Sequence, residues 1–412
     1  MSLTSLRWPI VLAVVTISCG FYGLLWAGLL ADPQLRGIDF IAFYTAGRLA
    51  QTAPLSELYN LELQRAVQVP IVGPNFVEGG LLSYNHPPFL APLLGAIVGD
   101  DYRASYVRWA LLLTAAVAAV ALLMGARFRA GGGERGAAAL VALGALVFYP
   151  GFIGVLKGQD TALIVLGAAG AYYGLATGRP LAAGLALGLT VIKPQLALAL
   201  GLPLMLASRR AGLGFLLSAG GLGLLSMAMV GAGGVRDYLA LIALSNAGTG
   251  YGLNQEAMYN VVGLVVRAAP AIDRGLLDAV KWGAFLAGVG AVCWLWWARR
   301  DRIGDAELGV AVLVALVVSP HLHFHDLSLA LIAVLALAVG WREAGGRRAA
   351  AAPLVPALAS LLLLLASLLP GALGYAAVYL LLAALLAALL APGGRAGGYA
   401  VAPWGASSGP RS

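Results

Sequence analysis

Side chains that could carry out chemistry gather in five short motifs of an otherwise apolar chain. The chain has 412 residues, 61% of them apolar by type, and all four of its histidines fall in two of these motifs. Lysines, carboxylates and amides occupy the rest. The motifs are Gly37-Ile38-Asp39-Phe40 with Tyr44, Tyr84-Asn85-His86-Pro87-Pro88, Lys157-Gly158-Gln159-Asp160, Lys193-Pro194-Gln195 and His321-Leu322-His323-Phe324-His325-Asp326.

This set of residues suits the displacement of a phosphate by a hydroxyl group. Lys193, Lys157 and the histidines can donate hydrogen bonds to an anion, and Asp39 is a carboxylate far from them in sequence. A single base can take the proton of the attacking hydroxyl while cations stabilise the departing phosphate. Because phosphate is already a good leaving group, a second carboxylic acid of the kind that glycosidases use is unnecessary.

Four of the motifs also have purely structural interpretations. Asp39 could cap a helix that begins near Ile41. Lys193 could extend its amine to the lipid headgroups. The pair of prolines after His86 could start a helix, and Gln159-Asp160 could do the same with a favourable acid at the positive end of the helix dipole.

The three alternate histidines, His321, His323 and His325, invite a metal interpretation, since imidazole is a common zinc ligand. Residues at this spacing share a face only in a strand and diverge on a helix. The chain has no HExxH motif, and the segment follows Ser319-Pro320 at a helix boundary. We therefore expect these rings to bind an anion and predict no metal site and no cofactor.

The composition shows which elements must position these motifs. Only 11% of the residues are charged, whereas an ordinary soluble domain has about 25%, so the chain cannot cover its surface with solvated groups. This excludes a cytosolic globular enzyme, a disulfide-stapled secreted domain and a disordered protein. Cys19 and Cys293 lie inside apolar runs, which gives no disulfide framework. Apolar stretches long enough to cross a bilayer recur throughout, so the sequence predicts an all-α polytopic membrane protein.

We expect twelve membrane segments with both termini inside. Segment 180–207 is interrupted by Lys193-Pro194-Gln195, and two short helices that meet at Lys193 would avoid burying its ammonium in mid-membrane. The other expected spans are 8–30, 105–126, 136–152, 160–177, 211–231, 275–298, 306–319, 326–341, 350–370 and 371–391.

The charge distribution supports this topology. The predicted inner side carries most of the 26 basic residues and few of the 18 acidic ones, as the positive-inside rule requires. The long outer loops are then 31–104 and 232–274. The first has helical pieces at Phe43–Gln51 and Ser56–Val67 and an apolar stretch at 87–98 that suits the membrane interface. We expect a single domain over 1–392 and a disordered tail over 393–412.

The order of the motifs resembles glycosyltransferase family 87, the bacterial group of polyprenyl-phosphate-mannose-dependent α-1,2-mannosyltransferase-like membrane proteins. The resemblance runs from about residue 8 to 340. It implies a GT-C fold of about 12 transmembrane segments, with juxtamembrane helices in the first outer loop. It also implies a place in the bacterial inner membrane, with the active site facing the periplasm. The segments that carry it are 37–50, 58–60, 84–94, 157–166, 183–198, 254–262 and 319–331.

The resemblance also implies roles for individual residues. Asp39 takes the position of the catalytic aspartate in the first outer loop, and Lys193 matches a lysine that we assign to the lipid phosphate. Asp160 and His86 depart from the family, which often has Asn and Tyr there. The remaining donor or phosphate contacts are His321, His323, His325 and Asp326, and the sugar or acceptor contacts are Tyr44, Tyr84, His86, Gln159, Asp160, Gln195, Asn254 and Gln255.

The expected partners are a polyprenyl-phosphate sugar donor, a lipid or glycan acceptor and membrane lipids. No dinucleotide-type glycine fingerprint is present, and no DxD-type metal motif occurs in a soluble segment, which favours a lipid-linked donor over a nucleotide sugar; no nucleic acid partner is expected. The alternative is a transporter or flippase of polar-headed lipids, since broken helices and intramembrane charge also occur in transporters. The absence of an internal repeat counts against it.

Overall fold

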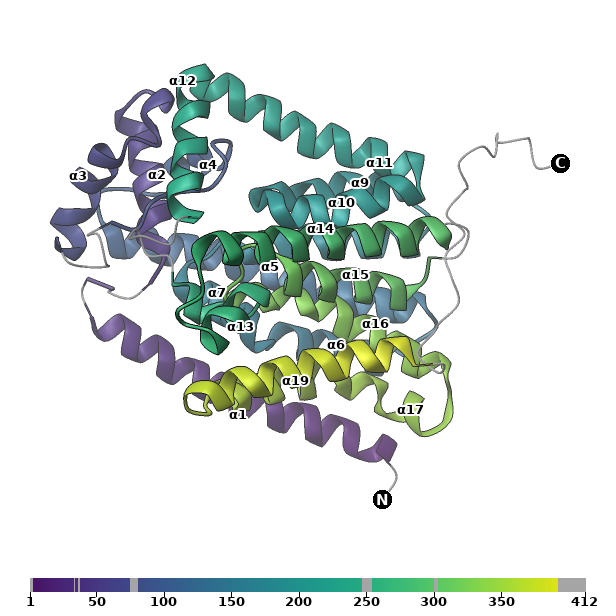
Figure 1. Ribbon diagram of the computed structural model, residues 1–412. Helices are drawn as coiled ribbons and strands as arrows, with labels where there is room; N and C mark the ends of the chain where they lie inside the picture. Colours follow the sequence, from purple (N-terminus) through teal and green to yellow (C-terminus); the bar gives the residue numbers. More distant parts are fainter. Residues whose placement is uncertain are drawn as a thin grey trace.

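The computed structural model describes residues 3–32, 34, 35, 38–74, 81–246, 254–299 and 303–391, and this part of the chain is helical without strands. Gly37 and the predicted tail over 393–412 lie outside it. The long helices run side by side in one bundle, and a group of shorter helices lies at one of its ends (Figure 1). The first residues of α1 and the last of α19 both lie at the opposite end.

The bundle is formed by helices that are mostly long and apolar. They are α1 (Leu3–Ala31), α5 (Tyr102–Ala130), α6 (Arg135–Leu146), α7 (Tyr149–Lys157), α8 (Thr161–Ala176), α9 (Pro180–Leu187), α10 (Pro194–Ala207), α11 (Arg209–Phe215), α12 (Gly221–Asn246), α14 (Arg274–Ala298), α15 (Asp305–Val318), α16 (Ala330–Glu343), α17 (Gly346–Ala351), α18 (Val355–Ser367) and α19 (Gly371–Leu390).

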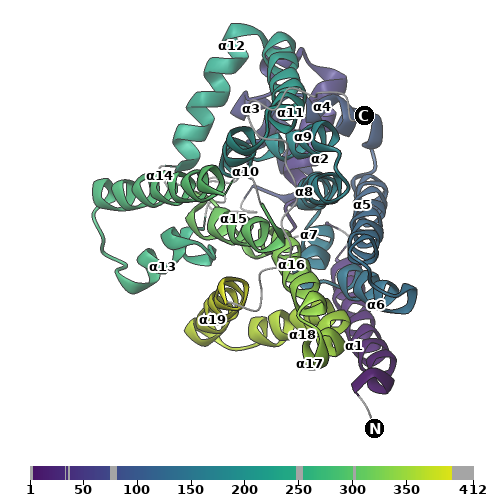
Figure 2. The ribbon, with the colours of Figure 1, turned by 90° about the vertical axis from the view of Figure 1, so that its right-hand side faces the viewer.

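Seven helices of the described residues are long and apolar enough to cross a membrane, and the bent pair α6–α7 gives an eighth. Large apolar side chains point outward, with Leu24, Leu122 and Leu380 each at least 70% exposed. Helix α16 is the exception, because it lies among α15, α18 and α19 near the centre of the bundle and is almost wholly buried (Figure 2). An apolar exterior around a packed interior is what a multi-pass membrane protein requires.

Two sequence expectations can be compared directly with these helices. The chain does break at Lys193: the 3₁₀ helix η2 (Gly188–Ile192) ends there, Lys193 is extended, and α10 begins at Pro194. Proline suits the first position of a helix, where its missing N–H costs nothing. Helices α8, α9–η2 and α10 are apolar but shorter than a full span, and the count of twelve membrane segments stays a prediction.

The helix breaks at the expected start of the second outer loop. Helix α12 has a kink at Gly231, whose φ of 66° is in the left-handed region, and the chain beyond the kink is helical as far as Asn246. Glycine adopts this conformation without the steric cost that other residues meet. Beyond the kink, α12 packs against η1 (Leu55–Glu57) of the first outer segment. Helix α13 (Val261–Ala268) follows in the same loop.

The first outer segment forms the group of short helices α2 (Phe40–Thr52), α3 (Leu61–Val72) and α4 (Leu90–Ile97) (Figure 1). Asn60 caps α3 by accepting hydrogen bonds from the next turn. Two buried glutamines of α3 then hold the extended chain that leads to His86. Gln68 exchanges hydrogen bonds with the backbone of Leu82 at 2.8 and 3.0 Å, and Gln64 accepts one from the Tyr84 amide at 2.8 Å.

The charge distribution predicts which end of the bundle faces the outside. In a variant without Cys19 and Cys293, Glu62→Cys on exposed α3 should react with a membrane-impermeant maleimide in intact cells. Glu134→Cys, between α5 and α6 and beside several arginines, should react only after the membrane is permeabilised. The opposite labelling pattern would show that the orientation is inverted.

Candidate active site

The turn between α7 and α8 is where four of the five motifs meet. It comprises Lys157 to Thr161, with Gly158 in the left-handed conformation at φ 72°. Two buried aromatic residues of α5 fix it, since Trp109 donates a hydrogen bond to the Gly158 carbonyl at 2.8 Å and Tyr106 donates one to the Leu156 carbonyl at 2.7 Å. A Cβ on Gly158 would lie 2.7 Å from Cβ of Phe40, so glycine is needed for α2 to approach.

Asp39 lies at the first turn of α2 but its side chain does not cap that helix. Its backbone amide donates to the Lys157 carbonyl at 2.9 Å, and its Oδ2 accepts a hydrogen bond from Nε2 of Gln159 at 2.7 Å. The carboxylate is partly buried. The Asp39 side chain therefore does not act as a helix cap. Gln159 instead orients its carboxylate beside the turn.

Lys193 and Asp326 form a buried ion pair across the bundle. The Lys193 ammonium, from the break before α10, donates to Oδ1 of Asp326 at the start of η5 (Phe324–Leu329). Thr161 approaches the same oxygen at 3.4 Å, and the His323 amide donates to Oδ2 at 3.0 Å. The lysine side chain is 8% exposed and the aspartate 1%, so the lysine does not extend to the headgroups. Such a pair is costly to break because either charge alone would be buried without a partner.

The histidines of the last motif lie next to this pair. The rings of His321 and His323 are 4.8 Å apart between centroids, and those of His323 and His325 are 5.9 Å apart. Burial, together with the positive charge of Lys193, holds the pKa of His321 well below its usual range. Burial also lowers the pKa of His323, against the effect of Asp326 and Asp39. At neutral pH both rings are therefore uncharged, and each can donate one hydrogen bond.

His86, from the one motif not yet placed, meets Asp160 of the α7–α8 turn. Nδ1 of His86 lies 2.9 Å from Oδ2 of Asp160, whose side chain is fully buried, while the histidine side chain is 12% exposed. The imidazole packs against Phe43 at 4.8 Å and Tyr84 at 5.5 Å between ring centroids. Within the described residues no group of three or more His, Cys, Asp or Glu side chains is arranged to hold a metal ion.

The other residues singled out from the sequence are spread more widely. Tyr44 donates to the carbonyls of Gly99 and Asp100 at 3.0 and 3.3 Å, and Tyr84 donates to the Pro87 carbonyl at 3.0 Å, so both hydroxyls hold the backbone. Gln195 is partly buried in the first turn of α10. Asn254 is exposed and caps the short helix η4 (Gln255–Ala257), which Gln255 begins.

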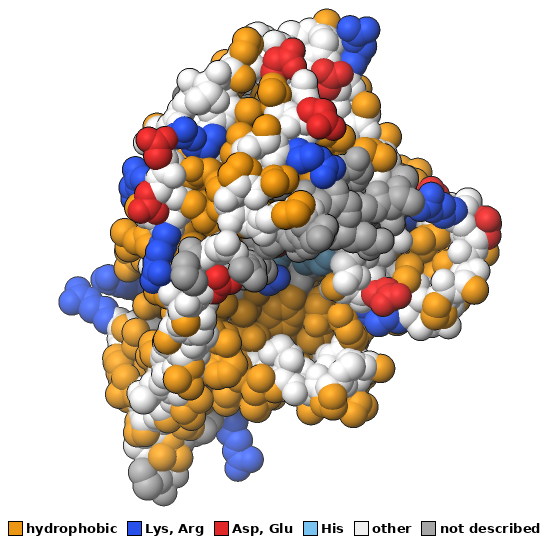
Figure 3. Space-filling model, turned by 90° about the vertical axis from the view of Figure 1, so that its left-hand side faces the viewer, with side chains coloured by type: hydrophobic (Ala, Val, Ile, Leu, Met, Phe, Trp, Pro, Cys, Tyr) orange, Lys and Arg blue, Asp and Glu red, His pale blue; other side chains and the backbone are white. Residues whose placement is uncertain are grey.

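Thr161 is the residue at this site that sequence reasoning missed. A threonine at the first position of an apolar helix carries no distinctive sequence signal, and only the fold places it against Asp326. Figure 3 views the bundle from the end that carries α2 to α4, and a small area of histidine colour is visible there in a hollow, above apolar side chains.

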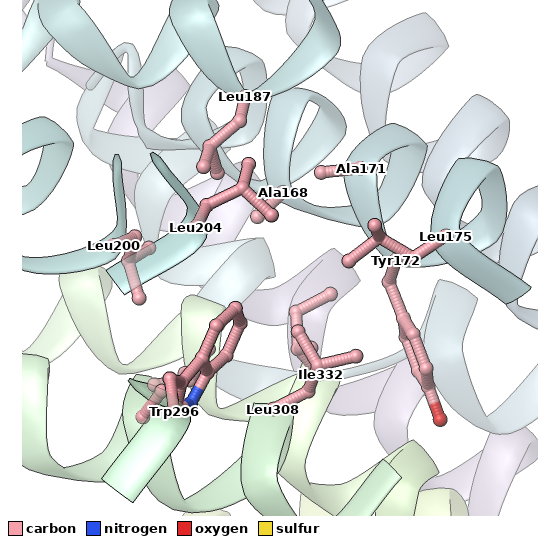
Figure 4. Close-up of a pocket in the computed structure, with 12 residues that line it drawn as sticks. Ala168, Ala171, Tyr172, Leu175, Leu187, Leu200, Leu204, Trp296, Leu308 and Ile332 are labelled. Carbon is pink, nitrogen blue, oxygen red and sulfur yellow. The ribbon is translucent and has the colours of Figure 1, made fainter. Parts of the chain in front are cut away.

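A separate apolar pocket lies at the other end of α8. Its lining comes from α8, α9, α10, α14, α15 and α16 and contains no charged side chain (Figure 4). The Tyr172 hydroxyl points away from it and donates to Asp305, which also pairs with Arg127 at 2.6 Å. Tyr172 is four residues from the end of α8 and Asp160 precedes its start, so the pocket lies at the other end of this helix from the site at Asp39.

Comparison with known proteins gives one family. The sequence model of glycosyltransferase family 87 matches residues 84–320, more than half of the chain. No curated protein and no solved structure matches the chain significantly. The matched region includes His86, the α7–α8 turn and Lys193, whereas Asp39 precedes it and the motif from His321 to Asp326 follows it.

The requirement for glycine in the α7–α8 turn can be tested against a second left-handed glycine. Gly158→Ala should lower the midpoint of thermal unfolding in detergent by more than Gly178→Ala. Both changes place an alanine in the left-handed conformation, which costs about 1–2 kcal/mol. A Cβ at Gly158 would also collide with Phe40, whereas nothing lies within 4 Å of a Cβ at Gly178. Equal losses in the two variants would contradict the close approach of Phe40.

The buried ion pair gives a second stability prediction. Lys193→Met leaves Asp326 buried without its cation and should destabilise the protein by roughly 3–5 kcal/mol, measured by denaturant unfolding. Adding Asp326→Asn should recover most of that loss, because the buried charge is then gone. The control is Lys281→Met, since its partner Asp278 is 55% exposed and can be solvated. A single variant as stable as this control would refute the coupling.

Proposed function

The chain belongs to glycosyltransferase family 87, and we propose that it transfers a hexose, mannose in the first instance, from a polyprenyl-phosphate donor to a hydroxyl of a lipid-linked or glycan acceptor. The observation that carries this proposal is the convergence of Asp39, Lys193 and the histidine motif around the α7–α8 turn. These residues come from distant parts of the chain, and together they supply one base and several donors at the end of an apolar bundle.

Asp39 is the proposed general base. Its carboxylate takes the proton of the acceptor hydroxyl as the oxygen of that hydroxyl attacks the anomeric carbon. The bond between that carbon and the phosphate oxygen breaks, and the electron pair leaves with the lipid phosphate. Gln159, which donates to Oδ2, fixes the orientation of the carboxylate. A single displacement of this kind inverts the anomeric configuration of the transferred sugar.

Lys193 and the histidines are the proposed phosphate-binding groups. The ammonium has three protons, so its bond to Asp326 leaves donors for a phosphate oxygen. Neutral His321 and His323 can each add a hydrogen bond as negative charge develops on the leaving phosphate. Asp326 holds the lysine in place through Oδ1, and its Oδ2 accepts a hydrogen bond from the backbone amide of His323.

Sugar and acceptor contacts follow from position around this centre. His86, Gln159, Gln195 and Gln255 present partly exposed polar side chains, and these are the proposed hydroxyl-binding residues. Tyr44, Tyr84 and Asn254 hold local backbone, and we propose that they shape the walls of the cleft. The charge distribution along the sequence supports a site that faces the periplasm of a bacterial inner membrane.

The role of Asp39 is tested by removing its basicity. Asp39→Asn should lower transfer of radiolabelled mannose from polyprenyl-phosphate mannose to lipid acceptors by about 10²–10⁴-fold in membrane preparations. Asp100→Asn is the matched control, since that carboxylate is 95% exposed and pairs only with Arg48 in the described structure. Undiminished transfer by Asp39→Asn would refute the base. Label that changes leaflet without becoming covalently attached would indicate the flippase alternative.

A further inference from the structure

Asp160 is a buried carboxylate beside the proposed site. Its side chain is fully buried at the start of α8, and neither oxygen accepts a hydrogen bond of good geometry in the described part of the chain. The atom at ion-pair distance is Nδ1 of His86, 2.9 Å from Oδ2. Burying a carboxylate costs free energy unless a donor or a cation compensates its charge. We therefore expect the contact with His86 to offset much of the cost of burying Asp160.

The contact determines where His86 carries a proton. A carboxylate oxygen can only accept, so at 2.9 Å from Oδ2 a protonated Nδ1 is favoured over an unprotonated one, whether the ring is neutral or charged. The ring cannot turn away easily, because it packs against Phe43 and Tyr84. The backbone is held as well, since the carbonyl of His86 accepts a hydrogen bond from the Tyr59 hydroxyl at 2.8 Å. Nε2 is then the nitrogen that remains for another partner.

His86 is placed where that partner could be a substrate. Asp160 directly follows Gln159, which holds the proposed base. The histidine side chain is 12% exposed, in contrast to its fully buried partner. An enzyme that transfers sugars has several hydroxyls to orient at such a place.

We propose that Asp160 is a positioning residue that fixes His86 with Nδ1–H toward itself, so that Nε2 forms a hydrogen bond with a hydroxyl of the donor or acceptor sugar. This proposal rests on the proposed function for its ligand, although not for the Asp160–His86 contact. It makes His86 a residue that selects among sugars, because a fixed hydrogen-bonding group discriminates against a substrate that lacks its partner.

The contact is tested without any activity. The chain has four histidines, so ¹⁵N-histidine labelling of the full protein in detergent gives a simple NMR spectrum, and the His86 signals are those absent from His86→Asn. In the wild type, Nδ1 of His86 should carry the proton. Asp160→Asn should keep it there, because the amide oxygen still accepts, whereas Asp160→Leu should move it toward Nε2. An unprotonated Nδ1 in the wild type, or three identical spectra, would overturn the proposal.

Deoxy substrates identify the sugar hydroxyl that is proposed to bind Nε2 of His86. Polyprenyl-phosphate mannose and octyl mannoside serve as donor and acceptor, each compared with its monodeoxy analogues. The wild type should lose about tenfold or more in kcat/KM for one hydroxyl. His86→Asn keeps an amide near Nδ1 to satisfy Asp160 but has no atom at Nε2, so it should treat that analogue and the parent alike. Whether the sensitive hydroxyl is on the donor or the acceptor identifies the sugar.

The two arms separate the possible failures. A His86→Asn protein that unfolds at the wild-type temperature and still discriminates against every deoxy analogue as the wild type does would overturn the role of His86. Loss of folding in that variant shifts the comparison to His86→Gln, whose amide reaches toward Nε2 and should retain the discrimination. If the wild type transfers no mannose, the proposed function fails, and the NMR result still decides the contact.

Discussion

Compensation of buried carboxylates at one end of an apolar bundle is the constraint on which the site depends. Asp160 and Asp326 are buried and Asp39 is partly so, and each has a specific partner. The turn between α7 and α8 provides or borders all three arrangements within five consecutive residues. Because these contacts share one backbone turn, a displacement of that turn would disturb the proposed base, the phosphate-binding lysine and His86 together.

The membrane-like exterior explains why the polar contacts are so concentrated. Outward-facing side chains are leucines and other apolar residues, so polar groups have no other place to be satisfied than inside the bundle or at its ends. Breaks in the helices, at Lys193 and at Gly158, give the backbone freedom to present side chains between packed helices. Aromatic residues of α5 and glutamines of α3 then hold these irregular segments from outside the site.

Much of this arrangement could be predicted, and the exceptions have physical causes. Proline after Lys193 predicts the break there because it disfavours a continuing helix. The expected end of the apolar run at residue 231 coincides with the kink at Gly231, but hydropathy did not predict that the chain beyond the kink is helical to Asn246. The sequence also left open whether Asp39 caps α2 or serves the site. Local sequence cannot decide this, because the competing partner, Gln159, is 120 positions away.

The sequence by itself determined that the chain is a multi-helix membrane protein, that its polar residues cluster in a few motifs, and to which family it belongs. These properties are written in composition, periodicity and local order. Only the tertiary structure decided which motif contacts which: that Lys193 pairs with Asp326, that Asp160 faces His86, and that Thr161 joins them. Pairing depends on how distant helices pack, and packing depends on the shapes of all the side chains between them.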